Sequence, residues 1–195
     1  MGKIGLFDLE RHFAFYGAYH NNPVNILIHM VFVWPILYTS LVLFYFTPAF
    51  FECPFKCRLG LIPNFGLLLT LIYAVFYICL DKKAGSLAAL LCFICWISGS
   101  LVAKRLEFSV AWKFVLAAQL FCWTGQFIGH GVFEKRAPAL LDNLVQAFLM
   151  APFFVLLEAL QYFGYEPYQG FRTSVKAKVE AEIQKWQDKK EKKSS

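Results

Sequence analysis

Charged residues are scarce in this sequence. Asp, Glu, Lys and Arg make up 16% of its 195 residues, whereas soluble domains contain about 25%. Hydrophobic residues reach 58%, which is more apolar surface than one small globule can bury. The low hydrophobicity that disorder requires is also absent. The composition therefore excludes an ordinary soluble domain and predicts an integral membrane protein, in which lipid replaces water against the apolar faces.

Several motifs of other function classes are missing. The first 20 residues lack the features of a secretory signal. The sequence has no Gly-rich dinucleotide fingerprint and no haem motif, so we expect no separate redox cofactor of those kinds. No nucleic-acid partner is expected either. Four of the six cysteines lie inside apolar runs, where a free Cys packs as a small hydrophobe: Cys79, Cys92, Cys95 and Cys122. The redox state of Cys53 and Cys57 stays open.

The apolar runs predict an all-α protein with four to five transmembrane helices. They cover residues 24–46, 65–80, 84–103, 111–129 and 139–163, and the first exceeds the roughly 20 residues that cross the hydrocarbon core. The fifth run contains Asp142, Asn143, Pro152 and Glu158, so a span, a re-entrant element or an interfacial helix stays open. Asp142 and Asn143 are candidate caps for its helix.

Two segments outside these runs complete the predicted architecture. Residues 4–19 are amphipathic and too polar to span, which is typical of a helix lying in the membrane interface. Asn22 is a suitable N-cap and Pro23 a suitable first residue for the helix that follows. An N-terminal interfacial helix and the first span are therefore expected to form a hairpin that turns near residue 22.

The C-terminal segment differs from the rest in charge. Residues 172–195 contain eight Lys or Arg and four Asp or Glu, which predicts a charged helix or tail on the cytosolic side. We therefore expect a membrane-embedded catalytic domain at 1–171 and a basic cytosolic tail at 172–195, with residues 175–195 dispensable for chemistry. Lys192 and Lys193 resemble the dilysine retrieval signal of endoplasmic reticulum membrane proteins, which is an address read by a receptor.

The four histidines all lie in or beside apolar segments, where polar groups are costly and mark functional sites: His12, His20, His29 and His130. A hairpin turning near residue 22 brings His12 and His29 to the same level. His20 lies about 12 Å along the axis from His12 unless the helix breaks at Gly17. We expect the histidines to form a metal site.

His130 and Glu134 are four residues apart and share a helix face. They suit a pair of ligands, or one ligand with a carboxylate that supports it. Imidazole suits Zn, Cu, Fe and Ni, and a carboxylate with open positions favours non-haem Fe(II). The spacing does not separate iron from zinc.

Two other interpretations of these residues stay open. The histidines could only form hydrogen bonds, in which case the chain is a non-enzymatic scaffold or lipid-binding protein of the endoplasmic reticulum. Lys135 and Arg136 are candidates for binding a substrate carboxylate, or they are interfacial residues whose charged ends reach water. Metal analysis of the purified protein separates the enzyme from the scaffold.

Three segments carry a resemblance to a known family. RHFAFYGAYHNNPVNILIHMVFVWP, GQFIGHGVFEKRAPAL and LMAPFFVLLEAL resemble the yeast-type endoplasmic reticulum 2-hydroxy fatty acid dioxygenases, which convert phytosphingosine-derived 2-hydroxy acids into odd-chain fatty acids. The match runs from residue 11 to about residue 160. It implies an Fe(II) enzyme of the endoplasmic reticulum membrane that uses O2 and releases CO2 from a long-chain 2-hydroxy fatty acid. It also implies metal ligands at His20, His29 and His130, with His12 at a matching place.

Overall fold

The structure is a computed structural model that describes residues 5–50, 61–138, 144 and 146–194. Its regular elements within these ranges are helices: α1 (Leu9–Tyr19), α2 (Pro23–Phe44), α3 (Phe65–Leu80), α4 (Lys82–Ile128), the π-helices η1 (Gly129–Glu134) and η3 (Gln146–Met150), α5 (Ala151–Tyr162) and α6 (Phe171–Ser194). The predicted all-α class is confirmed. Cys53, Cys57, Asp142 and Asn143 lie outside the described residues.

Side-chain caps begin several of the helices, and the sequence predicts the one at Asn22. Asn22 accepts a hydrogen bond from the Val24 amide at 2.9 Å, with Pro23 as the first residue of α2. Asp8 and Asp81 cap α1 and α4 in the same way. These caps satisfy amides that the helix itself leaves without a partner.

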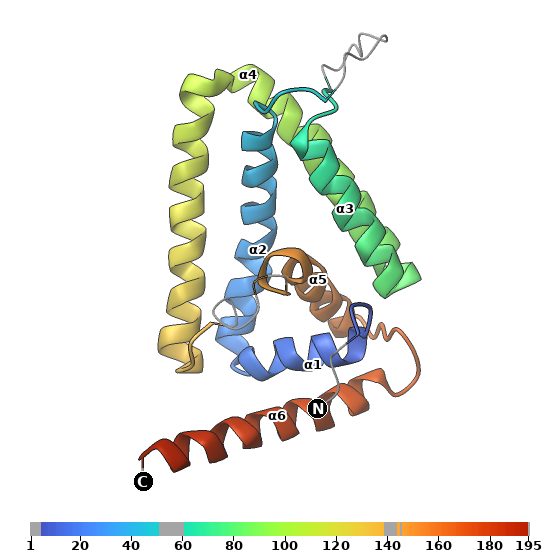
Figure 1. Cartoon of the computed structure of the whole chain (residues 1–195), viewed down its shortest axis with the longest axis vertical. Helices are drawn as coiled ribbons and strands as arrows, with labels where there is room; N and C mark the ends of the chain where they lie inside the picture. Colours follow the sequence, from blue (N-terminus) through green and yellow to red (C-terminus); the bar gives the residue numbers. More distant parts are fainter. Residues whose placement is uncertain (1–4, 51–60, 139–143, 145, 195) are drawn as a thin grey trace.

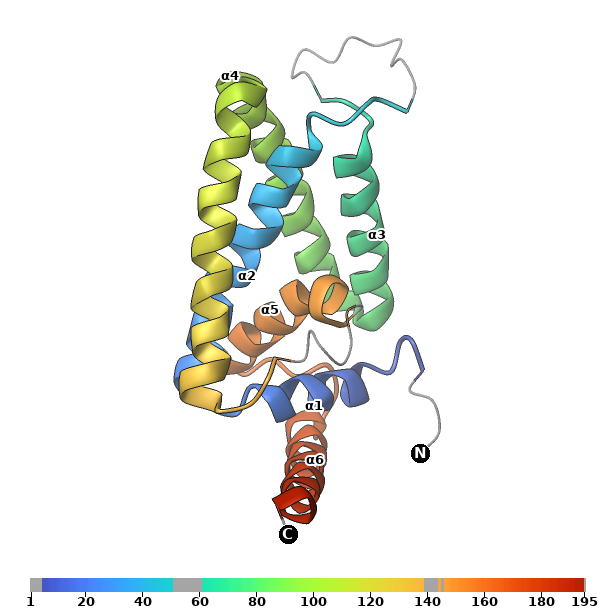
Figure 2. The same ribbon diagram turned by 60° about the vertical axis from the view of Figure 1, so that its left-hand side comes forward.

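Two layers make up the molecule (Figures 1 and 2). Helices α2, α3 and α4 stand upright and side by side, while α1 and α6 lie across one end, with α5 between them and the upright helices. Helix α4 is bent into an inverted V at Glu107, whose backbone has φ 57° and ψ 163°. The described chain begins and ends at the end covered by α1 and α6.

The number of long apolar helices is smaller than predicted. Among the described residues, two helical segments are long and apolar enough to cross a membrane by length and composition, Pro23–Phe44 and Lys82–Glu134, against the four or five expected. The predicted third and fourth spans are arms of the single helix α4, and α3 has only 16 residues. The fifth apolar run is divided between η3 and the short helix α5.

The C-terminal segment is not a separate tail. Phe171 is fully buried and Val175 is 8% exposed, and both belong to the main hydrophobic cluster. Lys178 forms an ion pair with Glu10 of α1. A Cβ atom on Gly17 of α1 would lie 2.9 Å from Val179 Cγ2, so α1 and α6 approach closely there. The predicted boundary at residue 172 therefore falls at the start of α6, and this helix packs against α1. Sequence periodicity does not predict this packing, because α6 has few apolar side chains among its many charged ones.

Truncation after Ser174 is therefore expected to destabilise the protein, whereas the sequence-based prediction that residues 175–195 are dispensable concerns only the chemistry. It removes Val175 and Val179, and burial of one valine side chain is worth about 1.5–3 kcal/mol. Thermal unfolding in detergent should show a lower midpoint than that of the full chain. Truncation after Asp188, which keeps these contacts, is the matched control and should unfold like the full chain. Equal stability of both truncated proteins would contradict the packing role of α6.

Candidate metal centre

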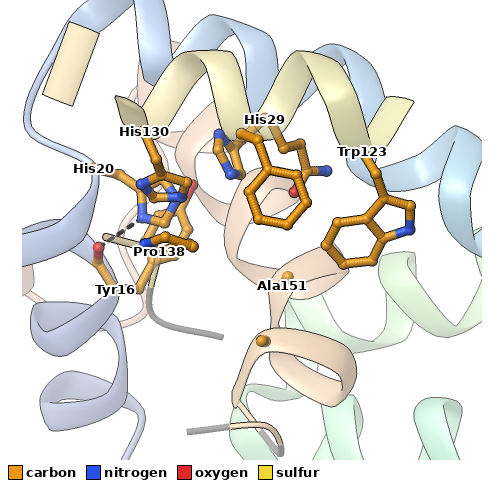
Figure 3. A pocket seen from close by; sticks show the side chains of 10 residues that line it. Tyr16, His20, His29, Trp123, His130, Pro138 and Ala151 are labelled. Carbon is orange, nitrogen blue, oxygen red and sulfur yellow. Dashed lines mark hydrogen bonds between the residues drawn. The ribbon is translucent and has the colours of Figure 1, made fainter. Parts of the chain in front are cut away.

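Three histidines from separate elements converge in the interior (Figure 3). His20 ends α1, His29 lies about two turns into α2, and His130 lies in η1. Each offers one ring nitrogen, and these three atoms all lie within 4.8 Å of one another. The ring centroids of His20 are 4.3 Å from His29 and 4.9 Å from His130. All three side chains are buried.

Local backbone geometry turns two of the rings inward. His20 Nδ1 donates to the carbonyl oxygen of Tyr16 at 2.8 Å, and His29 Nδ1 donates to that of Asn25 at 2.9 Å. Since a carbonyl oxygen only accepts, Nδ1 carries the proton in both rings and Nε2 keeps its lone pair. A metal-bound histidine commonly has this arrangement, with the second nitrogen held by a carbonyl.

Two buried ring nitrogens of the three histidines have no hydrogen-bond partner. His20 Nε2 and His130 Nδ1 are buried and accept or donate no hydrogen bond. Burial and the neighbouring rings of His29 and His130 hold the pKa of His20 well below its usual range, so the ring is neutral. A buried polar atom without a partner is costly. Neutral, inward-facing imidazoles of this kind fit a divalent metal ion.

Glu134 forms hydrogen bonds that link η1 to the turn between α1 and α2. Its carboxylate accepts hydrogen bonds from the backbone amides of Asn21 and Asn22, at 3.1 and 3.0 Å, and from Asn25 Nδ2 at 3.1 Å. These donors lie at the positive N-terminal end of α2, where a carboxylate is stabilised. Glu134 thereby ties the turn between His20 and His29 to the element that carries His130. Glu134 is not one of the three residues whose ligand atoms all lie within 4.8 Å of one another. Its contacts are instead those of a residue that positions other residues.

The two basic residues after Glu134 have different surroundings. Lys135 is exposed and ends η1 with a left-handed backbone, φ 53°. Arg136 donates from Nη1 to the Ala18 carbonyl oxygen at 2.7 Å, and its guanidinium lies 3.6 Å from the centre of the Tyr19 ring. Arg136 thus also holds η1 against α1. Binding of a substrate carboxylate by Lys135 and Arg136 stays a prediction.

His12 lies apart from the other three histidines. Its Nε2 donates to the Gly5 carbonyl oxygen at 3.0 Å, and it is not in the ligating group. Helix α1 runs without a break through Gly17, so the separation of eight positions between His12 and His20 keeps them about 12 Å apart along the axis. Helix α1 therefore lacks the bend at Gly17 that would bring His12 close to the other three histidines.

A tyrosine and a glutamate beside His20 were missed as a pair by the sequence analysis. The Tyr16 ring stacks on His20 with centroids 4.1 Å apart, and its hydroxyl donates to Glu158 Oε2 at 2.9 Å. Burial raises the pKa of Glu158 to about 7. In the sequence, Glu158 stands out only because it interrupts the fifth apolar run. This interruption is the signal that identifies a buried pair, because a carboxyl group inside an apolar helix requires a polar partner.

The histidines open into a mostly apolar cavity of about 60 Å³. Figure 3 shows His20 and His130 on one side of it and Trp123 and Ala151 on the other. Its remaining lining residues are Tyr16, His29, Gln126, Phe127, Pro138 and Ala147. The cavity therefore has the three imidazoles at one end and mostly apolar side chains along the rest of its wall.

Comparisons with known proteins give a family and a relative that this chain resembles. Residues 6–163 match the family described as 2-hydroxy-palmitic acid dioxygenase Mpo1-like. The chain is 36% identical over 169 residues to 2-hydroxy-palmitic acid dioxygenase MPO1 of Saccharomyces cerevisiae, covering 86% of this chain and 87% of the relative. No solved structure matches the chain significantly.

Proposed function

This chain belongs to the 2-hydroxy-palmitic acid dioxygenase Mpo1-like family, and we propose that it oxidises long-chain 2-hydroxy fatty acids with O2. The observation that carries the proposal is the convergence of three buried imidazoles on one cavity. The yeast relative is named for 2-hydroxy-palmitic acid, which is the substrate class we assign. In the balanced reaction, a 2-hydroxy acid and O2 give the acid one carbon shorter, CO2 and water.

His20, His29 and His130 would hold the metal, which we propose is Fe(II). Zinc has no redox chemistry of its own, so an oxidation with O2 favours iron among the metals that suit imidazole. When bound, Fe(II) supplies the redox chemistry that O2 needs to oxidise the carbon bearing the hydroxyl group.

The protein's own residues position the reactants. The Tyr16 and Asn25 carbonyl groups orient two of the imidazoles, and Glu134 keeps the elements that carry them together. The aromatic rings of Trp123 and Phe127 line the cavity and reduce the access of water. Lys135 and Arg136 follow η1 directly and are our candidates for attracting the substrate carboxylate.

Metal content and turnover test this function together. Protein purified in detergent under anaerobic conditions should contain iron in proportion to protein and convert 2-hydroxypalmitate to pentadecanoate and CO2. Chelation should remove the iron and the activity, and Fe(II) but not Zn(II) should restore turnover. Protein that lacks iron and remains inactive after Fe(II) is added would favour the scaffold or lipid-binding alternative.

We also propose that the upright helices cross a membrane. Each arm of the 47-residue helix α4 has more than 20 residues, which is about the length that a span requires. Large apolar side chains are exposed along these helices, for example Val75 at 61%, Leu120 at 61% and Phe121 at 67%. Contiguous exposed apolar surface is rare on soluble monomers. In this arrangement α2, α3 and the two arms of α4 make four crossings, and α1 and α6 lie at the interface.

An even number of crossings puts both ends of the chain on the same side. We propose that this is the cytosolic side of the endoplasmic reticulum, because the C-terminal helix is basic. Protease treatment of intact microsomes should remove a tag from either end. A protected C-terminal tag would contradict this orientation. Replacing Lys192 and Lys193 with Ser should let the protein move towards the Golgi, and an unchanged location would mean that these lysines are not a retrieval signal.

A further inference from the structure

A second cavity adjoins the cavity of the histidines. It holds about 360 Å³. The two cavities share the lining residues Trp123, Gln126, Ala147 and Ala151. The second one therefore lies directly beside the first, in the layer of upright helices between α2, α3, the second arm of α4 and α5.

The second cavity follows one face of α2. Its α2 lining residues are Val33, Ile36, Leu37, Ser40 and Phe44. They continue the face of His29, because their spacings from it are those of neighbouring helical turns. The helix rises about 1.5 Å per residue, so the path from His29 to Phe44 is about 22 Å long. Carbon–carbon bonds of about 1.52 Å at roughly 111° advance an extended chain by about 1.25 Å per carbon, which makes a palmitoyl chain about 19 Å long.

The polar groups on this path are satisfied within the protein. Gln119 donates from Nε2 to the Ile36 carbonyl oxygen at 2.9 Å and to Thr39 Oγ1 at 2.8 Å. Its Oε1 accepts the indole N–H of Trp123 at 2.9 Å. Ser40 donates to the Ile36 carbonyl oxygen at 2.8 Å. Since these groups need no water or polar ligand, the wall suits a hydrocarbon chain.

We propose that this second cavity is the acyl-chain site, with the substrate head at the histidines and its terminal methyl group beside Phe44. The inference rests on the proposed function, and it makes Ser40 and Phe44 determinants of chain length. The occupant we assign is the substrate's own chain and not a membrane lipid, because the cavity adjoins the one that holds the imidazoles and shares four lining residues with it.

Substitutions along α2 test the position of the chain. Ser40→Phe should close the last roughly 6 Å of the roughly 22 Å path and leave about 16 Å for a chain of about 19 Å. About two methylene groups then lose their place in the cavity, so the ratio of kcat/KM for 2-hydroxypalmitate over 2-hydroxyoctanoate should fall roughly 15-fold. Phe44→Ala should shift preference the other way, towards acids longer than palmitate. Ser98→Phe is the matched control, because Ser98 bonds its own helix in the first arm of α4 and lines neither cavity.

The outcomes distinguish failure of the proposed function from failure of the acyl-chain site. Wild-type protein with bound iron that oxidises neither acid would overturn the proposed function. Active wild-type protein whose chain-length ratio is the same in the Ser40→Phe and Ser98→Phe variants would overturn only the acyl-chain site.

Cross-linking of the wild-type protein covers the case in which Ser40→Phe does not fold. A 2-hydroxypalmitate with a diazirine near its methyl end should label peptides that contain Ser40–Phe44 or Leu69–Tyr73. Excess unlabelled 2-hydroxypalmitate should remove this label, while phosphatidylcholine vesicles should not. Labelling confined to outward-facing residues such as Val75, or label that phosphatidylcholine removes, would contradict the proposal.

Discussion

Replacing His20, His29 or His130 with Ala is expected to abolish both iron binding and turnover while the protein still accumulates. Each imidazole supplies one of three nitrogens that lie within 4.8 Å of one another. The cavity beside them is lined mainly by apolar side chains, so no neighbouring group there replaces a lost ligand. Because the rings are buried, each alanine leaves a small cavity, and the cost to folding should be far smaller than the cost to metal binding.

His12→Ala is the matched control for these three variants. It removes an imidazole from α1 that bonds the Gly5 carbonyl oxygen and stands outside the ligating group. Iron content by mass spectrometry and turnover of 2-hydroxypalmitate should be near wild type in this variant. Wild-type iron and turnover in the His20, His29 and His130 variants would end the metal hypothesis. Loss of iron in His12→Ala would place a fourth imidazole at the metal.

Glu134→Ala is expected to weaken iron binding and turnover by about 10–100-fold, which is the usual cost of losing a group that orients a ligand. The carboxylate holds the amides of Asn21 and Asn22 and the side chain of Asn25. Its removal should loosen the turn between His20 and His29 without removing a nitrogen ligand. Glu134→Gln keeps one acceptor oxygen and should fall between Glu134→Ala and wild type.

Titration of the apoprotein with Fe(II) measures this effect separately from catalysis. The Glu134→Ala protein should still bind stoichiometric iron when enough is added, and turnover should then recover in large part. Glu182→Ala, which removes an exposed pair with Lys185 on α6, controls for the loss of a carboxylate elsewhere. A Glu134→Ala protein that binds no iron even at high concentration, like His130→Ala, would make Glu134 a ligand.

The parts of the site that depend on short spacings along the chain were predictable. Asn22 and Pro23 predict the turn that begins α2, because caps and fixed proline dihedrals act within one helical turn. The expected hairpin, however, paired His12 with His29, whereas the structure brings His20 to His29, because α1 lies across the end of α2 and does not run antiparallel to it. The importance of His130 was predictable from the cost of a polar residue in an apolar run.

The remaining roles depended on contacts between residues far apart in the sequence. Glu134 is 112 residues from Asn22, and Tyr16 is 142 residues from Glu158. Periodicity carries no information about such pairs, because it reports which face of an element is apolar and not what that face meets. For the same reason, the docking of α6 on α1 and the merging of two predicted spans into α4 were not foreseen.

Composition, capping and local helix geometry are enough to predict the helical class, the turn at Asn22 and the candidate imidazoles. The packing of the helices decided that three of the four histidines meet and that His12 does not. It also decided that Glu134 meets backbone amides of the α1–α2 turn. The physical reason is that ligand convergence depends on how helices pack, and packing is set by the sum of many weak contacts between distant segments.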